Sequence, residues 1–321
     1  MKITELFQNR EFVVSAEVGP PKGIHIDGMV EEAKKYLTGV HFVNVTDNQS
    51  SVMRLGSLAT CKVLKDAGLN PIFQLTCRDR NRIALQSDLL SAAMLGIDNI
   101  LCLTGDHTKL GDHPQAKPVF DLDSVSLLYA ASMLETGKDL GGNELVGEAP
   151  KFAKGAVVSP CSDSVDAQLV KMERKVKAGA EYFQTQAVFE PEKFIKFMEA
   201  AKQFGKPVQV GIIIPKSAGM CKFMNNNVAG VHIPDELIAE REVSLSEITH
   251  VVVHPAYEVE RLLPNDVAPE DLERTYTYTA DVVEAPVTKG DVLGEVTISY
   301  EDQVYATVPL LARDDVAASR L

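Results

Sequence analysis

Seven apolar runs of strand length recur in the first two thirds of the chain. They lie at residues 12–18, 41–46, 71–76, 99–104, 155–159, 182–188 and 208–214. The segments between them show helical spacing of apolar positions, at about 27–37, 52–67, 80–95, 122–136, 164–178 and 190–204. Continuous apolar strands that alternate with helices are typical of a parallel sheet covered on both faces. The pattern therefore predicts an α/β fold.

Polar groups stand at the carboxyl ends of several of these runs. Glu17, Asp47, Asp106 and Gln186 each end or follow an apolar run. In a barrel of parallel strands all such ends open on one face, where the chemistry takes place. A doubly wound sheet would also fit the alternation. We favour a TIM-like (β/α) barrel because the polar ends are scattered over many strands and no GxGxxG turn follows the first strand.

The alternation stops after the seventh run. A helix-like stretch ends near 235–241, and the remaining runs, at 248–254, 275–278, 292–300 and 304–311, read as β-strands separated by turns. Residues 297–305 have the pattern of a hairpin. We therefore predict a barrel over 1–241 that lacks a recognisable eighth β/α unit, followed by a small all-β domain over 242–321. The first and seventh strands would have unpaired edges, and 248–254 is the best candidate to cover them.

Charge supports the same division. The chain carries a net charge of −13, and residues 242–321 alone carry −11. Neither segment is basic, which argues against duplex nucleic acid as a partner. The five cysteines show no CxxC spacing, which indicates buried thiols in a reducing compartment and no predicted metal site. No apolar run approaches 18 residues and the start has no apolar signal core, so we expect a cytoplasmic protein without a membrane span.

The first 240 residues resemble the methylenetetrahydrofolate reductases, flavin-dependent enzymes of one-carbon metabolism that serve methionine biosynthesis. The resemblance rests on short motifs in family order and spacing, each weak by itself. These are Glu17–Pro21, Val45–Asp47, Gln74–Cys77, Leu103–Asp106, Arg174–Ala180 and Thr185–Gln186. The family fold is a (β/α)8 barrel with the flavin at the carboxyl ends of the strands.

The resemblance implies roles for three residues in the folate reaction. Glu17 matches the family's general acid, which must hold a proton near neutral pH and therefore needs a raised pKa. Asp106 matches an aspartate near flavin and folate that would stabilise a cationic intermediate. Gln186 matches a glutamine that binds the pterin. The plainer alternatives are a carboxylate capping a loop, an aspartate in a turn, and a strand glutamine that satisfies the backbone.

The resemblance also implies a flavin site, with FAD preferred over FMN. Thr46 and Lys175 match flavin contacts, and Lys175 would reach the phosphate or ribityl region. The plainer reading of this helical lysine is a solvated surface. Gln74, Thr104 and Gly105, together with Asp106, complete the expected cofactor-binding set.

Several positions depart from the family pattern. Gln74 stands where histidine is common, and Thr104 stands where arginine is common. Residues 159–163 replace a His-Pro-Glu signature, and residues 215–220 lack the aromatic side chain that stacks on substrate. These departures indicate a divergent short-chain branch and leave the electron donor open between NADH, NADPH and a protein. A homo-oligomer is a further expectation.

The tail resembles a second family, the carboxyl-terminal β domain of D-alanyl-D-alanine carboxypeptidases. Three segments carry this resemblance: Leu262–Pro264, Glu284–Gly294 and Val308–Ala312. The peptidase motifs SxxK and KTG are absent from the chain, so no peptidase activity follows.

The sequence thus leaves three functional hypotheses. The first is a flavoenzyme that reduces 5,10-methylenetetrahydrofolate by ping-pong hydride transfer, the second is a non-catalytic flavin- or folate-binding protein with an incomplete barrel, and the third is a cell-wall-associated module. The absent signal peptide argues against the third.

Overall fold

The computed structural model describes residues 1–162, 164–215, 218–228, 231–234, 240–244, 250–256, 272–301 and 303–318. The chain divides into two compact units, Met1–Ile213 and Ile214–Leu321. Each unit has its own sheet, and we describe them separately.

The first unit is built on seven parallel strands whose spatial order equals their order in the chain. They are β1 (Ser15–Val18), β2 (Phe42–Val45), β3 (Pro71–Thr76), β4 (Asn99–Leu103), β5 (Ala153–Val158), β6 (Tyr182–Ala187) and β7 (Val208–Gly211). Every neighbouring pair is parallel. Among the described residues no strand pairs with the outer edge of β1 or of β7. The incomplete TIM-like barrel is therefore confirmed.

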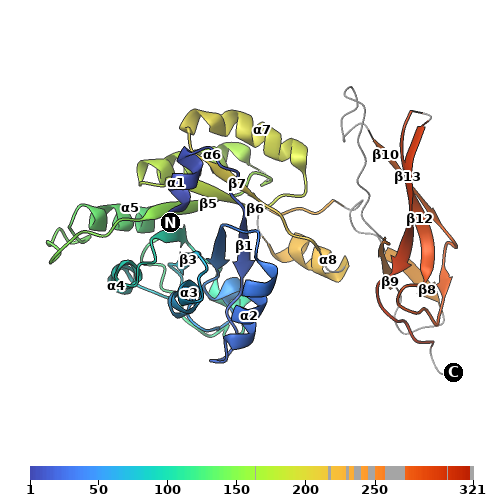
Figure 1. Cartoon of the computed structure of the whole chain (residues 1–321), viewed down its shortest axis with the longest axis horizontal. Coiled ribbons are helices and arrows are strands. Elements are labelled where there is room, and N and C mark those ends of the chain that lie inside the picture. Colours follow the sequence, from blue (N-terminus) through green and yellow to red (C-terminus); the bar gives the residue numbers. More distant parts are fainter. Residues whose placement is uncertain are drawn as a thin grey trace. The chain divides into compact units, whose positions relative to one another are not determined.

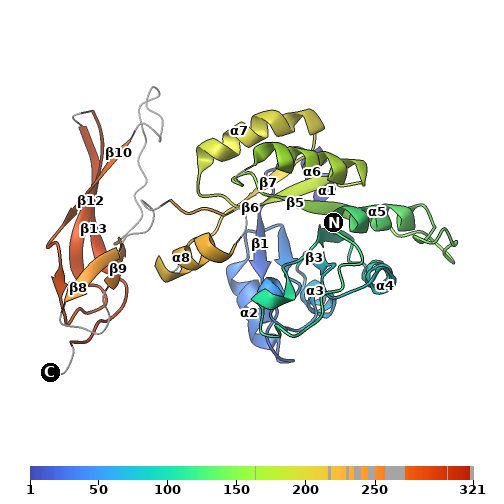
Figure 2. The ribbon, with the colours of Figure 1, turned by 180° about the vertical axis from the view of Figure 1, so that it is seen from behind.

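Helices follow the strands and lie around the outside of the sheet (Figures 1 and 2). They are α2 (Asp27–Tyr36), α3 (Ser57–Asp66), α4 (Arg82–Met94), α5 (Ser124–Glu135), α6 (Val165–Lys177) and α7 (Pro191–Ala201), with short 3-10 turns η1 (Gln49–Ser51), η2 (Thr108–Leu110) and η3 (Lys202–Phe204). Local chemistry fixes their ends. Asp123 caps α5 by accepting a hydrogen bond from the Ser126 amide, and Gly179 after α6 adopts a φ of +112°, which favours glycine.

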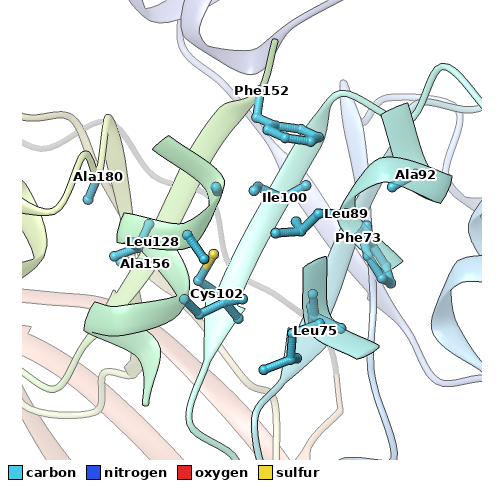
Figure 3. Packing of buried hydrophobic residues seen from close by; sticks show 14 of the residues in the cluster. Phe73, Leu75, Leu89, Ala92, Ile100, Cys102, Leu128, Phe152, Ala156 and Ala180 are labelled. Carbon is cyan, nitrogen blue, oxygen red and sulfur yellow. The ribbon is translucent and has the colours of Figure 1, made fainter. Parts of the chain in front are cut away.

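The main core lies between the sheet and these helices (Figure 3). Phe73 of β3 and Ile100 of β4 pack with Leu89 of α4 and Leu128 of α5, and all four are fully buried. The long apolar runs read from the sequence thus supply one wall of this core, and the apolar stripes of the helices supply the other. This packing holds the strand ends in place.

Two details of the first unit differ from the predictions. The helix expected from residue 52 begins at Ser57, because the backbone is extended at Val52 and again at Gly56, the N-cap of α3. The sequence analysis also missed α1 (Ile3–Gln8). The backbone amide of Ile3 donates to the buried Asn99 side chain at 2.8 Å, which ties this helix to the start of β4.

The second unit contains α8 (Ala218–Asn227) and a six-stranded sheet in the order β10-β12-β13-β9-β8-β11. Its strands are β8 (Glu240–Ser244), β9 (His250–Pro255), β10 (Glu273–Tyr278), β11 (Val283–Glu284), β12 (Val292–Tyr300) and β13 (Gln303–Ala312). The antiparallel pairing of β12 with β13 confirms the expected hairpin. The all-β tail is also confirmed.

Two expectations about the junction were wrong. The helix-like stretch does not reach residue 241, because α8 ends at Asn227 and residues 240–244 form β8; residues 235–239 lie outside the described residues. Residues 250–255 belong to the tail sheet, because β9 pairs with β13 on one side and β8 on the other; residues 248–249 lie outside the described residues. The domain boundary at 241, which falls within β8, stays a prediction.

Candidate functional site

Side chains alternate between the two faces of the barrel sheet. On the inner face the amino-terminal ends of the strands are apolar and meet α1. This inner cluster contains Ile3, Leu6, Phe42, Ile72, Leu101, Ala153 and Tyr182. Residues two and four positions further along a strand share its face, so Thr46 and Gln186 lie on the inner side at the carboxyl ends. Glu17 joins them, because it is in register with Asn44.

The carboxyl of Glu17 is partly desolvated by the protein around it, although the residue itself is exposed. Its Oε1 accepts a hydrogen bond from Gln49 Nε2 at 3.0 Å. Desolvation by the surrounding protein raises its pKa, and the hydrogen bonds from Gln49 and Gln74 oppose this only in part. The side chain nevertheless remains accessible to solvent. The carboxyl is therefore both inclined to hold its proton and open to a ligand.

Thr46 carries a buried polar atom without a partner. The residue is 2% exposed, and its Oγ1 makes no hydrogen bond to any residue that the structure describes. Arg54 Nε, nearby in the chain, is the other such atom among the described residues. A buried polar group left unpaired costs about 1–3 kcal/mol. An orphaned hydroxyl at the end of β2 therefore points to a ligand that supplies the missing bond.

The residue after Thr46 anchors this strand end. Asp47 accepts hydrogen bonds at Oδ2 from the Thr76 amide (2.9 Å), the Thr76 hydroxyl (2.8 Å) and Arg80 Nη1 (2.7 Å). Its Oδ1 accepts from Arg80 Nη2 at 3.2 Å. Arg80 also pairs with Asp88, and these carboxylates together raise its pKa against the opposing effect of burial. The ends of β2 and β3 are thus locked together by a buried ion pair.

The segment after β4 makes a close approach that only glycine permits. Gly105 has a φ of +90°, and a Cβ built there would lie 3.1 Å from Arg78 Cβ and 3.2 Å from Thr76 Cβ. Thr104 accepts a hydrogen bond from the Ser124 amide at 3.1 Å, which directs its hydroxyl to the start of α5. Asp106 is exposed and makes no hydrogen bond within the described part of the chain. Its carboxylate is therefore free to face a ligand.

Lys175 is not a solvated surface residue. Its Nζ donates to the Val157 carbonyl at the end of β5, at 2.6 Å. Burial is the main cause that lowers its pKa, to about 8, and the neighbouring Lys171 adds to the effect. This half-buried ammonium lies near the carboxyl end of β5. The plainer interpretation from the sequence was wrong.

The structure brings some of the expected residues together. Gln74 lies close enough to Glu17 to lower the pKa of its carboxyl, and Gly105 lies against Thr76, two residues beyond Gln74. The side chain of Gln186 makes no hydrogen bond to a described residue, so the structure does not support the alternative of a strand glutamine that satisfies the backbone. Its role in folate binding stays a prediction, as do the roles of Thr46, Thr104, Asp106 and Lys175.

Sequence reasoning missed a polar layer inside the barrel. Gln184 Nε2 donates to Asn44 Oδ1 at 3.1 Å and to Gln209 Oε1 at 3.2 Å. Gln209 Nε2 in turn lies 3.2 Å from the Val13 carbonyl and 3.5 Å from Ser15 Oγ. Polar residues at alternate positions within apolar strands were the available signal. The ion pair of Arg80 was also missed, although its charged run directly follows a strand.

The described residues contain no group of three or more His, Cys, Asp or Glu side chains placed to hold a metal ion. No helix in the described part of the chain is long and apolar enough to cross a membrane. All five cysteines are free and buried.

Comparison with known families gives two matches. The sequence model of Methylenetetrahydrofolate reductase matches residues 2–250. The model of Penicillin-binding protein 5, C-terminal domain, matches residues 235–318. The two matches overlap in the segment that contains β8. The first match covers more than half of the chain, and the second covers the tail.

Individual relatives agree with the first match. The chain is 26% identical over 200 residues to 5,10-methylenetetrahydrofolate reductase of Pectobacterium carotovorum subsp. carotovorum, covering 61% of each chain. The Escherichia coli enzyme of the same name is also 26% identical over 200 residues, with 61% of this chain and 62% of that protein covered. A probable methylenetetrahydrofolate reductase (NADPH) of Caenorhabditis elegans is 25% identical over 223 residues, covering 66% of this chain and 32% of that protein. The chain therefore matches less than two thirds of the length of these relatives.

Two solved structures resemble parts of the chain more distantly. Penicillin binding protein 5 from Haemophilus influenzae is 21% identical, covers 25% of this chain and 23% of its own, and gives a TM-score of 0.23. A Clostridium thermocellum protein that binds two copies of 5-methyl-5,6,7,8-tetrahydrofolic acid is 16% identical. The match covers 72% of this chain and 76% of that protein, with a TM-score of 0.49.

Proposed function

The chain belongs to the methylenetetrahydrofolate reductase family, and we propose that it reduces 5,10-methylenetetrahydrofolate to 5-methyltetrahydrofolate with a bound flavin. One observation carries this proposal: Glu17 stands at the end of β1 with a pKa raised by burial, yet remains accessible to a ligand.

Glu17 would supply the proton that opens the substrate. The methylene carbon of the substrate bridges two folate nitrogens, N5 and N10. Transfer of the Glu17 proton to N10 lets the bond between N10 and the methylene carbon break, leaving an N5 iminium cation that can accept a hydride. A general acid is most effective when its pKa lies near the working pH. The desolvation that raises the pKa of Glu17 moves it in that direction.

Two further residues would serve the folate. The side chain of Asp106 makes no hydrogen bond within the described chain and would place a negative charge near the iminium cation. A charge held in a fixed position stabilises such a cation better than water does. Gln186, on the inner face of β6, would bind the pterin through its amide, which offers both a donor and an acceptor.

The residues present fit a flavin. The orphaned Thr46 Oγ1 can accept or donate a hydrogen bond to it, Gly105 would present to it a backbone without a side chain, and Lys175 would face its phosphates or ribityl chain. Gln74 and Thr104 complete the proposed set. When bound, the flavin, FAD in preference to FMN, would supply two-electron hydride chemistry in a ping-pong cycle. The donor would be NADH, NADPH or a protein.

Glu17→Gln tests the proposal. The flavin-loaded full chain is reduced photochemically and mixed anaerobically with methylenetetrahydrofolate, and stopped-flow absorbance follows flavin reoxidation. We expect methylenetetrahydrofolate to reoxidise the flavin of the variant roughly 10²–10⁴-fold more slowly. The photochemical reduction of that flavin should be unchanged. Glu11→Gln, an exposed glutamate just before β1, serves as the matched control and should behave as the parent chain.

The outcomes are distinct. Normal folate reduction by Glu17→Gln would overturn the assignment of the acid. A parent chain that binds flavin and folate but never exchanges a hydride would instead be a non-catalytic binding protein. The five buried free thiols fit a reducing compartment, and we include a cytoplasmic location and a role in one-carbon supply for methionine biosynthesis in the proposal.

A further inference from the structure

The barrel has an open seam between β1 and β7. In a parallel strand, the N–H and C=O of one residue point to the same side, and those of the next residue point to the other side. The amide of His41 donates to Val14 O, and Thr46 N donates to Val18 O, so the even-numbered residues of β1 face β2. The backbone groups of Val13, Ser15 and Glu17 therefore face the seam. No described strand pairs with them.

Gln209 bridges this seam with its side chain. Its Nε2 lies 3.2 Å from the carbonyl of Val13, one of the groups that face the seam, and donates to it. The same nitrogen lies 3.5 Å from Ser15 Oγ. In a closed barrel a neighbouring strand would supply a backbone N–H to such a carbonyl. A side-chain amide from β7 supplies the bond in this chain.

The hydrogen bonds of Gln209 continue through further polar side chains inside the barrel. Gln209 Oε1 accepts from Gln184 Nε2 at 3.2 Å, and that nitrogen also donates to Asn44 Oδ1 at 3.1 Å. Asn44 Nδ2 lies 3.4 Å from Ser15 Oγ, which completes a ring of four polar side chains. Ser15 stands two residues before Glu17, and Gln184 stands two residues before Gln186. The ring is thus one layer below both folate residues.

The geometry points to Gln209 as a positioning residue: it clamps β7 to β1 and so fixes the separation of Glu17 from Gln186. The inference rests on the proposed function for the identity of these two residues, whereas the clamp itself rests on contacts alone. The position of a catalytic group relative to its substrate must be fixed, because a displacement of about 1 Å can lower the reaction rate 10²-fold. Within the part of the chain that the structure describes, no main-chain ladder joins β7 to β1 to set this separation.

The test is Gln209→Met, which keeps the length of the side chain and removes its hydrogen bonds. Hydrogen exchange of the flavin-loaded full chain should become faster in Ser15–Val18 and Val208–Gly211 and stay the same in β3 and β4. Flavin reoxidation by methylenetetrahydrofolate should slow roughly 10- to 100-fold, while flavin reduction is unchanged. Gln203→Met, where the parent amide is exposed and bonds only Ala200 O locally, is the matched control.

The exchange measurement tests the clamp, and the folate kinetics test the positioning role. Unchanged exchange in Gln209→Met overturns the clamp, and faster exchange with unchanged folate kinetics overturns the positioning role. If Gln209→Met does not fold, Ser15→Ala removes one acceptor of the same ring and should give smaller changes in the same two segments; no change there would also overturn the clamp. A parent chain without folate turnover refutes the proposed function, and the exchange measurement still tests the clamp.

Discussion

The buried pair of Asp47 and Arg80 gives the sharpest stability prediction. The Asp47 side chain is fully buried and accepts four hydrogen bonds, two of them from Arg80. In Asp47→Asn the amide oxygen can replace only one carboxylate oxygen, and the amide nitrogen then faces a donor. The negative charge that compensates Arg80 is lost as well. We expect this change to destabilise the first unit.

The magnitude follows from the contacts. Breaking a buried ion pair by removing one partner costs about 3–5 kcal/mol. Arg80 keeps Asp88 as a second partner at 2.9 Å, and the new amide oxygen still accepts from Thr76, so we expect about 2–4 kcal/mol. For a unit of this size 1 kcal/mol shifts the melting temperature by roughly 2–4 °C. A fall of about 5–15 °C should result.

Thermal melts of the full chain, followed by circular dichroism and by flavin release, measure this loss. Asp121→Asn is the matched control, because Asp121 pairs with Arg82 in a comparable bidentate contact that is largely exposed. Exposed pairs contribute little, so this variant should melt almost as the parent does. Equal melting temperatures for Asp47→Asn and Asp121→Asn would refute the reasoning that burial makes the first pair important.

Two further predictions concern the flavin site. Asp106→Asn should make the bound flavin easier to reduce, because removing a nearby negative charge favours the anionic reduced form. The midpoint potential of the flavin should rise by on the order of tens of millivolts. An unchanged potential together with unchanged folate kinetics would place Asp106 away from the site. Lys175 should make flavin affinity depend on pH, because its ammonium loses its charge as pH rises through about 8. Fluorescence titration should show weaker binding above that pH, and Lys175→Met should lose the dependence, whereas the exposed Lys177→Met should keep it. Since the pKa of Lys175 falls from 10.5 to about 8 on folding, the unfolded chain binds more protons between these values. Stability should therefore rise with pH across that window in the parent chain and in Lys177→Met, and this contribution should be lost in Lys175→Met.

The sequence alone determined the architecture of both parts. The alternation of seven apolar runs with helical segments required a parallel sheet covered by helices, because only that arrangement buries both faces of such strands. The change of pattern after residue 215 and the hairpin of residues 297–305 were likewise local signals.

Only the tertiary structure decided how the seam and the site are held. Gln209 meets Val13 across 196 positions of sequence, and Asp47 meets Arg80 across 33; no periodicity reports which polar residues will face each other. The same limit explains the error on 248–254, because an apolar β-run carries no signal for the sheet it will join. Burial likewise gave Lys175 its lowered pKa and left the Thr46 hydroxyl without a partner. These properties depend on what surrounds a residue in space, which the order of residues along one strand does not specify.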